Sequence, residues 1–378
     1  MLKSETDKTL PIFEAFPRLA ESVPWRSIAS WPTPIQRAER LGAAHGLSQL
    51  FIKREDLSHP IVGGNKLRGL EFLLADMVAR GATRIVTLSS VGSHHIARTA
   101  YHAKQLGIDT TAVVVDQPRA CYVCANLGLG LSSGARYVLA DYASALPRLV
   151  FERLRPLNRR AGKPPYYIAP GGTNSLACIG HVNAAFELQR QIERDEMSEP
   201  DFIYVPMGSL GTAAGLVLGC KLAGLRARVV GIVVSHRWYC TRGRTLRLAR
   251  RTLRRLRRYD PTIPSARLNS EGVEIVGRDL GKGYGEFTPE AARAAAELHA
   301  LEGVITDGTY AAKALSGMFG FIRDRALNHK VHLFWNTYHH LQGLERAEIR
   351  REVVPARLRA YFDLPVQPLD DQFPRPVH

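Results

Sequence analysis

Short apolar segments rich in β-branched and aromatic residues alternate with longer segments of helical periodicity along most of the 378-residue chain. Strands that are apolar throughout are typical of parallel sheets covered by helices on both faces. The predicted strands are Leu50–Lys53, Arg84–Leu88, Thr111–Val115, Tyr137–Leu139, Tyr166–Ile168, Phe202–Pro206, Arg228–Val234 and His332–Trp335. The predicted helices are Lys66–Arg80, His95–Leu106, Ser175–Glu193, Gly211–Ala223, Thr245–Arg258, Pro289–Glu302 and Tyr310–Asp324. We therefore predict an α/β protein with its chemistry on the loops after the strands.

The composition narrows the class of protein. Hydrophobic residues make up 45% and charged residues 23% of the chain, which excludes a disordered or fibrous protein. No apolar run approaches the roughly 18 residues of a membrane helix, and the polar N-terminus resembles no secretory signal. We expect a cytoplasmic protein with no membrane partner. Five scattered cysteines argue against a disulfide framework. The single pair Cys121 and Cys124 favours two buried thiols on one face of a helix, so we predict no metal site, although zinc or redox chemistry there stays open.

The net charge of +16 raises the question of nucleic-acid binding. Ten arginines and no acidic residue lie between Arg237 and Arg258, so this one segment supplies most of the excess charge. Apolar residues recur at helical spacing between the arginines: Leu246, Ala249, Leu253 and Leu256. This pattern favours a surface helix whose leucines pack on the protein. Docking to an acidic partner, to an anionic group of a substrate or to nucleic acid stays open, but sparse aromatic residues disfavour nucleic acid.

A loop of small residues follows the predicted strand Phe202–Pro206 and precedes a predicted helix. It contains Gly208, Ser209, Leu210, Gly211 and Thr212. Backbone N–H groups in such a loop, together with the positive end of a helix, bind anions. The glycines lack the G-x-G-x-x-G spacing and no Gly-Lys-Ser/Thr follows, which disfavours a dinucleotide or a Walker site. The loop fits a single terminal phosphate.

A lysine stands in the first turn of another predicted helix. Gly63, Gly64 and Asn65 precede Lys66 directly. A cation at a helix N-terminus is electrostatically unfavourable, so the helix dipole should lower the pKa of this lysine. A lower pKa supplies the free amine that a Schiff base requires. Lys66 is therefore a candidate nucleophile, although an ordinary solvated lysine stays open.

Several motifs occur together in one order, namely KREDL, GGNKLRGLEFLLADMVARGAT, Ser93-His94-His95, APGGTNSLACIGHVNAAFEL, GSLGTAAGL, GYGEFTPE and EGVITDGTYAAKALSGM. With them the chain, from about Pro32 to Gly343, resembles the 1-aminocyclopropane-1-carboxylate deaminase and D-cysteine desulfhydrase family of pyridoxal-phosphate enzymes. The resemblance implies the two-domain tryptophan synthase β-like fold of fold type II, with a mostly parallel sheet in each domain, and a homodimer. It implies a small domain at residues 63–169, inserted in a large cofactor-binding domain at residues 1–62 and 170–378.

The resemblance also implies roles for individual residues. Lys66 would carry pyridoxal 5'-phosphate, Asn65 would lie beside it in the cofactor turn, and the loop from Gly208 through Ser209, Leu210 and Gly211 to Thr212 would hold the phosphate. Ser93 would face the substrate carboxylate or the reacting carbon. Tyr284 would be an active-site tyrosine that moves a proton at the β-carbon or the leaving group. Thr337 would stand near the pyridine nitrogen as a hydroxyl donor.

Two positions depart from the family pattern. His94 stands where the family usually has an asparagine that contacts the cofactor, and it would either stack as a neutral imidazole or act in acid–base catalysis. The run Asn336-Thr337-Tyr338-His339-His340 replaces the usual His-Thr-Gly-Gly. His339 and His340 would line the substrate mouth or be solvated, whereas His95 should begin the helix and pack.

These residues predict a pyridoxal-phosphate-dependent lyase or deaminase. It would act on a small amino acid, by α,β-elimination as in D-cysteine desulfhydrase or by ring opening as in 1-aminocyclopropane-1-carboxylate deaminase, and release a keto acid and ammonia. One alternative is a β-replacement synthase with an unusual substrate in a specialised biosynthetic pathway. A further alternative is a catalytically inactive basic binding protein on the same fold.

Overall fold

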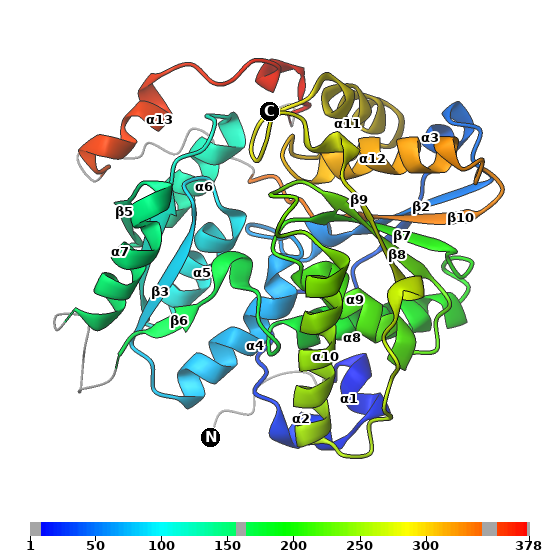
Figure 1. Ribbon diagram of the computed structural model, residues 1–378, viewed down its shortest axis with the longest axis horizontal. Helices are drawn as coiled ribbons and strands as arrows, with labels where there is room; N and C mark the ends of the chain where they lie inside the picture. Colours follow the sequence, from blue (N-terminus) through cyan, green and yellow to red (C-terminus); the bar gives the residue numbers. More distant parts are fainter. Residues whose placement is uncertain (1–8, 156–163, 342–353, 376–378) are drawn as a thin grey trace.

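The computed structural model describes residues 9–155, 164–341 and 354–375. Its strands form two sheets with helices packed around them (Figure 1). The larger sheet has six strands in the order β1-β2-β10-β7-β8-β9, and the smaller has four in the order β5-β4-β3-β6. Every pairing is parallel except that of β1 with β2. The predicted parallel α/β architecture is confirmed. The end of the family resemblance, Gly343, lies outside the described residues.

All eight predicted strands form, and two further strands were not predicted. The strands are β1 (Ile35–Arg37), β2 (Gln49–Arg54), β3 (Arg84–Ser90), β4 (Asp109–Val115), β5 (Arg136–Leu139), β6 (Tyr166–Ile168), β7 (Phe202–Met207), β8 (Arg228–Val233), β9 (Val273–Val276) and β10 (Val331–Asn336). The two unpredicted strands, β1 and β9, lie at the two edges of the larger sheet and are only partly buried. Short half-exposed edge strands give no continuous apolar run in the sequence.

The helices cover both sheets. They are α1 (Pro11–Ala15), α2 (Arg18–Ser22), α3 (Glu39–Ala44), α4 (Lys66–Ala79), α5 (His94–Gln105), α6 (Cys121–Ser132), α7 (Tyr142–Leu154), α8 (Cys178–Glu193), α9 (Gly211–Leu222), α10 (Arg242–Tyr259), α11 (Pro289–Glu302), α12 (Ala311–Asp324) and α13 (Ala360–Asp363). All seven predicted helices form, although α5 begins at His94 rather than at His95. Among the longer helices, α6 and α7 were missed. Helix α6 is apolar around its circumference, so it lacks the amphipathic periodicity, and α7 contains Pro147.

The two sheets correspond to different parts of the chain. Strands β3 to β6 all lie within residues 63–169, and the strands of the larger sheet lie outside that range. This arrangement accords with the predicted division into a small and a large domain, whose boundaries stay a prediction. No helix in the described part of the chain has both the length and the apolar character needed to cross a membrane.

The arginine-rich segment folds as the long surface helix that its periodicity predicts. Leu246, Ala249, Leu253 and Leu256 are buried in the core, while most of the arginines between them are exposed. The helix begins at Arg242, three residues earlier than predicted, because the side chain of Thr241 caps it by accepting the backbone N–H of Arg244.

A buried network of charges fixes the start of α4 against the larger sheet. The Nε of Arg68 donates to Oε2 of Glu55 at 2.8 Å, and its Nη1 donates to Oε2 of Glu187 at 2.9 Å. The Nζ of Lys53 donates to Oε1 of the same Glu187 at 2.6 Å. Although burial alone would raise it, these cations hold the pKa of Glu187 at about 2. Because Glu55 follows β2 and Glu187 belongs to α8, three elements meet at Arg68.

The close contact between α4 and α8 gives a stability prediction. A Cβ at Gly180 of α8 would lie 1.9 Å from the backbone oxygen of Arg68, whereas a Cβ at Gly243 of α10 would meet nothing within 4 Å. We expect Gly180→Ala to lower the free energy of unfolding by roughly 3 kcal/mol, because α4 and α8 must move apart. Gly243→Ala should change it by less than about 0.5 kcal/mol. Urea denaturation of both variants checks this, and equal midpoints would contradict the packing described.

Candidate active site

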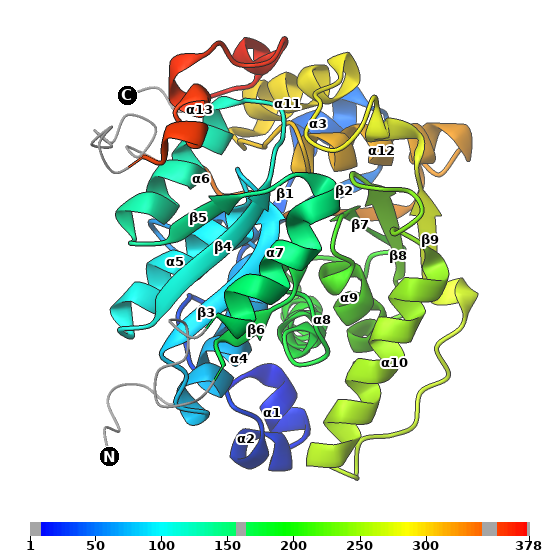
Figure 2. The same cartoon turned by 60° about the vertical axis from the view of Figure 1, so that its left-hand side comes forward.

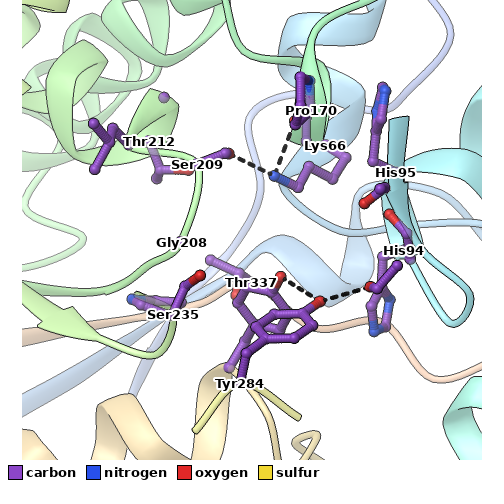
Figure 3. Close-up of a pocket in the computed structure, with 18 of the residues that line it drawn as sticks. Lys66, His94, His95, Pro170, Gly208, Ser209, Thr212, Ser235, Tyr284 and Thr337 are labelled. Atoms are coloured by element: carbon purple, nitrogen blue, oxygen red, sulfur yellow. Dashed lines mark hydrogen bonds between the residues drawn. The ribbon is translucent and has the colours of Figure 1, made fainter. Parts of the chain in front are cut away.

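A cavity of about 430 Å³ lies at the carboxyl ends of strands from both sheets. This is where open parallel sheets bind ligands. The residues proposed from the sequence to hold the cofactor or to react with substrate all border this one cavity: Asn65, Lys66, Ser93, His94, Gly208, Ser209, Leu210, Gly211, Thr212, Tyr284 and Thr337. They come from segments far apart in the sequence, which the two sheets bring together. Figure 3 shows Lys66 pointing toward Ser209 on one side, with Tyr284 on another.

Lys66 is the first residue of α4, and its amine is held by two groups. The Nζ donates to the backbone oxygen of Gly171 at 3.1 Å and to Oγ of Ser209 at 3.4 Å (Figure 3). Neither partner carries a charge. Burial therefore dominates and lowers the pKa of Lys66 to about 8. Its neutral form, the form that attacks an aldehyde, is then accessible close to neutral pH.

The loop between β7 and α9, from Gly208 to Thr212, has a backbone suited to an anion, and we refer to it as the anion cradle. Leu210 has φ of 73° and stands at the N-cap of α9, where an apolar side chain cannot accept the first N–H groups of the helix. A Cβ at Gly211 would lie 3.0 Å from Oγ1 of Thr173, so the backbone here can approach its surroundings closely. The Nδ2 of Asn65 donates to Oγ1 of Thr212 at 2.9 Å. This bond ties the lysine turn directly to the cradle.

Tyr284 belongs to a small group of hydroxyls on another side of the cavity. The hydroxyl of Tyr310 donates to that of Tyr284 at 2.9 Å, and Oγ of Ser90 lies 3.1 Å from the same oxygen. Burial raises the pKa of both tyrosines, so both stay protonated at neutral pH. Sequence reasoning missed Tyr310 as a site residue, although it lies in the quoted motif EGVITDGTYAAKALSGM. Only the fold shows that it meets Tyr284.

Asp307 holds Tyr310 in place. Its carboxylate accepts backbone N–H groups of Thr309, Tyr310 and Ala311 at 2.8 to 3.1 Å, at the start of α12. Burial raises the pKa of Asp307, and the three N–H groups oppose that rise. The aspartate thus acts as a fixed cap that positions the tyrosine.

His94 and Ser93 stand at the start of α5. Ser93 occupies the N-cap and is buried. The His94 ring stacks on Tyr122 at a centroid distance of 5.4 Å and meets the edge of Tyr338 at 5.3 Å. Its buried Nε2 has no hydrogen-bond partner among the described residues. Burial, with Arg98 and Lys66 nearby, lowers the pKa of His94 well below its usual 6.5, which favours the neutral imidazole over acid–base catalysis.

One of the other histidines, His339, differs from the expectation. His339 neither lines the cavity nor is solvated, because its Nδ1 lies 2.6 Å from the backbone oxygen of Asp56 and its Nε2 lies 3.1 Å from that of Ile61. Tyr338 lines the cavity instead. His95 is buried, as expected for a packing residue. The backbone oxygen of Thr337 accepts the N–H of Asn65, while the predicted contact of its hydroxyl with a ring nitrogen stays a prediction.

The described residues contain no cluster of three or more metal-ligating side chains. Cys121 and Cys124 lie together in the first turn of α6, as predicted for one helical face. Both are half-buried and therefore more exposed than the buried thiols that were predicted. By contrast, the cavity offers a half-buried amine with a lowered pKa, an anion cradle at a helix N-terminus and a buried imidazole nitrogen without a partner among the described residues. These features fit a phosphorylated aldehyde. They thus fit the cofactor that the sequence resemblance implies.

Comparison with known proteins agrees with this geometry. The family model described as "Pyridoxal-phosphate dependent enzyme" matches residues 27–336. A nocardicin C-9' epimerase of Nocardia uniformis subsp. tsuyamanensis is 34% identical, over 79% of this chain and 89% of its own. A D-cysteine desulfhydrase of Klebsiella pneumoniae is 30% identical, over 82% and 90%. The crystal structure of an ACC deaminase homologue superposes with a TM-score of 0.72 at 28% identity, over 87% and 94% of the two chains.

The buried amine gives a prediction about pH. Because the pKa of Lys66 is lowered to about 8, its neutral fraction should rise as pH increases through about 8, rather than near the usual 10.5. The rate at which the cofactor-free protein reacts with pyridoxal phosphate should follow that fraction and level off above about pH 9. Stopped-flow absorbance measures this rate. The Lys66→Ala variant is the control and should lose the titrating phase, and a midpoint above pH 10 would contradict the burial of the amine.

Proposed function

Because the chain belongs to the pyridoxal-phosphate dependent enzyme family, we propose that it is a lyase or deaminase that converts an amino acid into a keto acid and ammonia. The D-cysteine desulfhydrase and the ACC deaminase homologue among its relatives support this reaction class. The observation that carries the proposal is the amine of Lys66, which is half-buried, has a lowered pKa and lies beside Ser209 at the edge of the anion cradle.

We assign the role of each residue from its place in the cavity. The bound cofactor supplies an electron sink for the negative charge that develops at the substrate α-carbon. The loop from Gly208 to Thr212 would hold the phosphate, and Asn65 would keep this loop in register with the lysine turn. Lys66, with a pKa of about 8, can take the α-proton through its neutral amine.

The carboxylate and the β-carbon of the substrate would meet hydroxyl groups. Ser93, at the positive end of α5, is suited to orient the substrate carboxylate. Tyr284 stays protonated because burial raises its pKa, so its hydroxyl can donate a proton to the β-carbon or the leaving group. The hydroxyl of Tyr310 donates to the oxygen of Tyr284 and can stabilise negative charge there after the transfer. A neutral His94 would orient and stack, with no net proton transfer.

The test measures products from D- and L-cysteine and from 1-aminocyclopropane-1-carboxylate. We expect keto acid and ammonia in equal amounts from at least one of them. Lys66→Ala should abolish both, and Tyr284→Phe should lower kcat by roughly 10²- to 10⁴-fold, the usual contribution of a positioned proton donor. Tyr259→Phe is the matched control, because Tyr259 lies at the end of α10 outside the cavity, and it should leave kcat unchanged.

The same reactions run in heavy water separate the alternatives. A product that incorporates an added nucleophile would indicate β-replacement. Deuterium at the α-carbon of an otherwise intact amino acid that is recovered in the opposite configuration would indicate inversion, the type of reaction that the name of the relative from Nocardia describes. Cofactor binding without exchange of any α-proton would leave only a binding protein. Either of the last two results, with no keto acid, would overturn the lyase proposal.

We further propose that the protein is a cytoplasmic homodimer, as the family resemblance implies. Light scattering coupled to size-exclusion chromatography should give roughly twice the mass of the 41.9 kDa chain. A mass equal to one chain at micromolar concentration would contradict the dimer.

A further inference from the structure

We propose that the substrate carries a large apolar or aromatic side chain, which binds at the mouth of the cavity between Trp238 on one wall and Tyr142 and Leu146 on the other. This inference rests on the proposed function, because it takes Lys66 as the reacting end of the site. It extends the small amino acid expected from the sequence to one with a bulky distal group.

The exposure of three side chains carries the proposal. Trp238 is 68% exposed, Tyr142 is 64% exposed and Leu146 is 61% exposed, which makes them the three most exposed large hydrophobic side chains of the described residues. All three border the cavity that contains Lys66. Single exposed apolar residues are common on protein surfaces, but a group of them around one opening indicates a binding surface.

Trp238 is fixed although it is exposed. It lies between β8 and α10, and its ring stacks with His236 at a centroid distance of 5.9 Å. The guanidinium of Arg244 lies 5.3 Å from its ring and 4.9 Å from that of Tyr239. Tyr239, which also borders the cavity, meets the edge of the Trp238 ring at 5.9 Å. An aromatic surface held in this way binds a ligand with little loss of side-chain entropy.

The opposite wall is the first half of α7, which lies over the smaller sheet (Figure 2). Tyr142 and Leu146 are four residues apart, so they occupy one face of the helix. Ala145 and Leu149 occupy another face and are buried against the smaller sheet, which anchors the helix. Because its other face is anchored, the helix presents Tyr142 and Leu146 to the cavity without rearrangement.

The mouth is continuous with the reacting centre. The three side chains border the same cavity as Lys66 and Tyr284, and the substrate would share its volume of about 430 Å³ with the cofactor. They are distinct from the eleven residues proposed to hold the cofactor and react with substrate. One molecule can thus present its amino acid group to Lys66 and its apolar end to the mouth.

Matched substrates test the proposal on the holoenzyme. Cysteine and S-benzylcysteine share the amino acid group and the sulfur at the β-carbon and differ by the benzyl group. Elimination followed by hydrolysis converts either one to pyruvate and ammonia, with hydrogen sulfide or benzyl mercaptan as the other product. For the enantiomer that reacts, we expect kcat/KM to be at least about tenfold higher for the benzyl compound, as a filled apolar pocket provides. Equal values would overturn the proposal and leave the proposed function standing.

A binding measurement gives a readout without turnover. Phenylalanine and alanine have no β-leaving group, so calorimetric titration of the holoenzyme reports affinity alone. We expect phenylalanine to bind at least tenfold more tightly than alanine, and Trp238→Ala and Leu146→Ala each to reduce that ratio severalfold. Leu154→Ala is the matched control, since Leu154 is 54% exposed on the same helix but does not border the cavity, and it should leave the ratio unchanged.

The outcomes separate the two proposals. A preference for phenylalanine that depends on Trp238 and Leu146 supports the apolar subsite even when no amino acid yields a keto acid, in which case the lyase proposal fails alone. A ratio near one, or a ratio that Leu154→Ala reduces as much as Leu146→Ala does, would overturn the subsite.

Discussion

The position of one amine depends on a charged network that is almost completely shielded from water. Arg68 stands two residues after Lys66 and is held by Glu55 and Glu187, while Lys53 shares Glu187. Loss of one member of such a network leaves an uncompensated buried charge, which typically costs about 3–5 kcal/mol. The guanidinium also lies 3.9 Å from the ring of Trp31. The first turn of α4 is therefore fixed from several directions, as a reacting amine requires.

Burial, more than charge pairing, sets the chemistry of the cavity. It lowers the pKa of Lys66 and of His94 and raises the pKa of Tyr284. His94 and Tyr284 are thus neutral hydrogen-bonding groups near neutral pH, whereas Lys66 loses its proton near pH 8. The helix N-terminus at Gly211 provides positive potential for an anion. Buried Arg98 does not serve this purpose, because it donates to the backbone oxygens of Gly63 and of His339 and so braces the glycine turn.

The sequence predicts the parts of this molecule that depend on local pattern. Apolar runs locate the buried strands, and the rule that parallel strands carry ligands at their carboxyl ends brings distant motifs such as those of Lys66 and Ser209 to one place. It could not predict what depends on distant contacts. Tyr310 enters the site only because α12 packs beside Tyr284, and His339 turns away because the backbone oxygens of residues 56 and 61 happen to lie within its reach.

The mouth of the cavity is a place where specificity can change without disturbing the reacting centre. The first residues of the arginine-rich segment from Arg237 to Arg258 form one wall of this mouth. Arg244, from the first turn of α10, holds Trp238 there, while Leu246 and Leu253 anchor the helix to the core. The buried network around Arg68 lies on other elements, so substitutions in this segment can alter the mouth while Lys66 stays in place. The same arginine-rich segment thus supplies a basic helix on the outside and an aromatic wall on the inside.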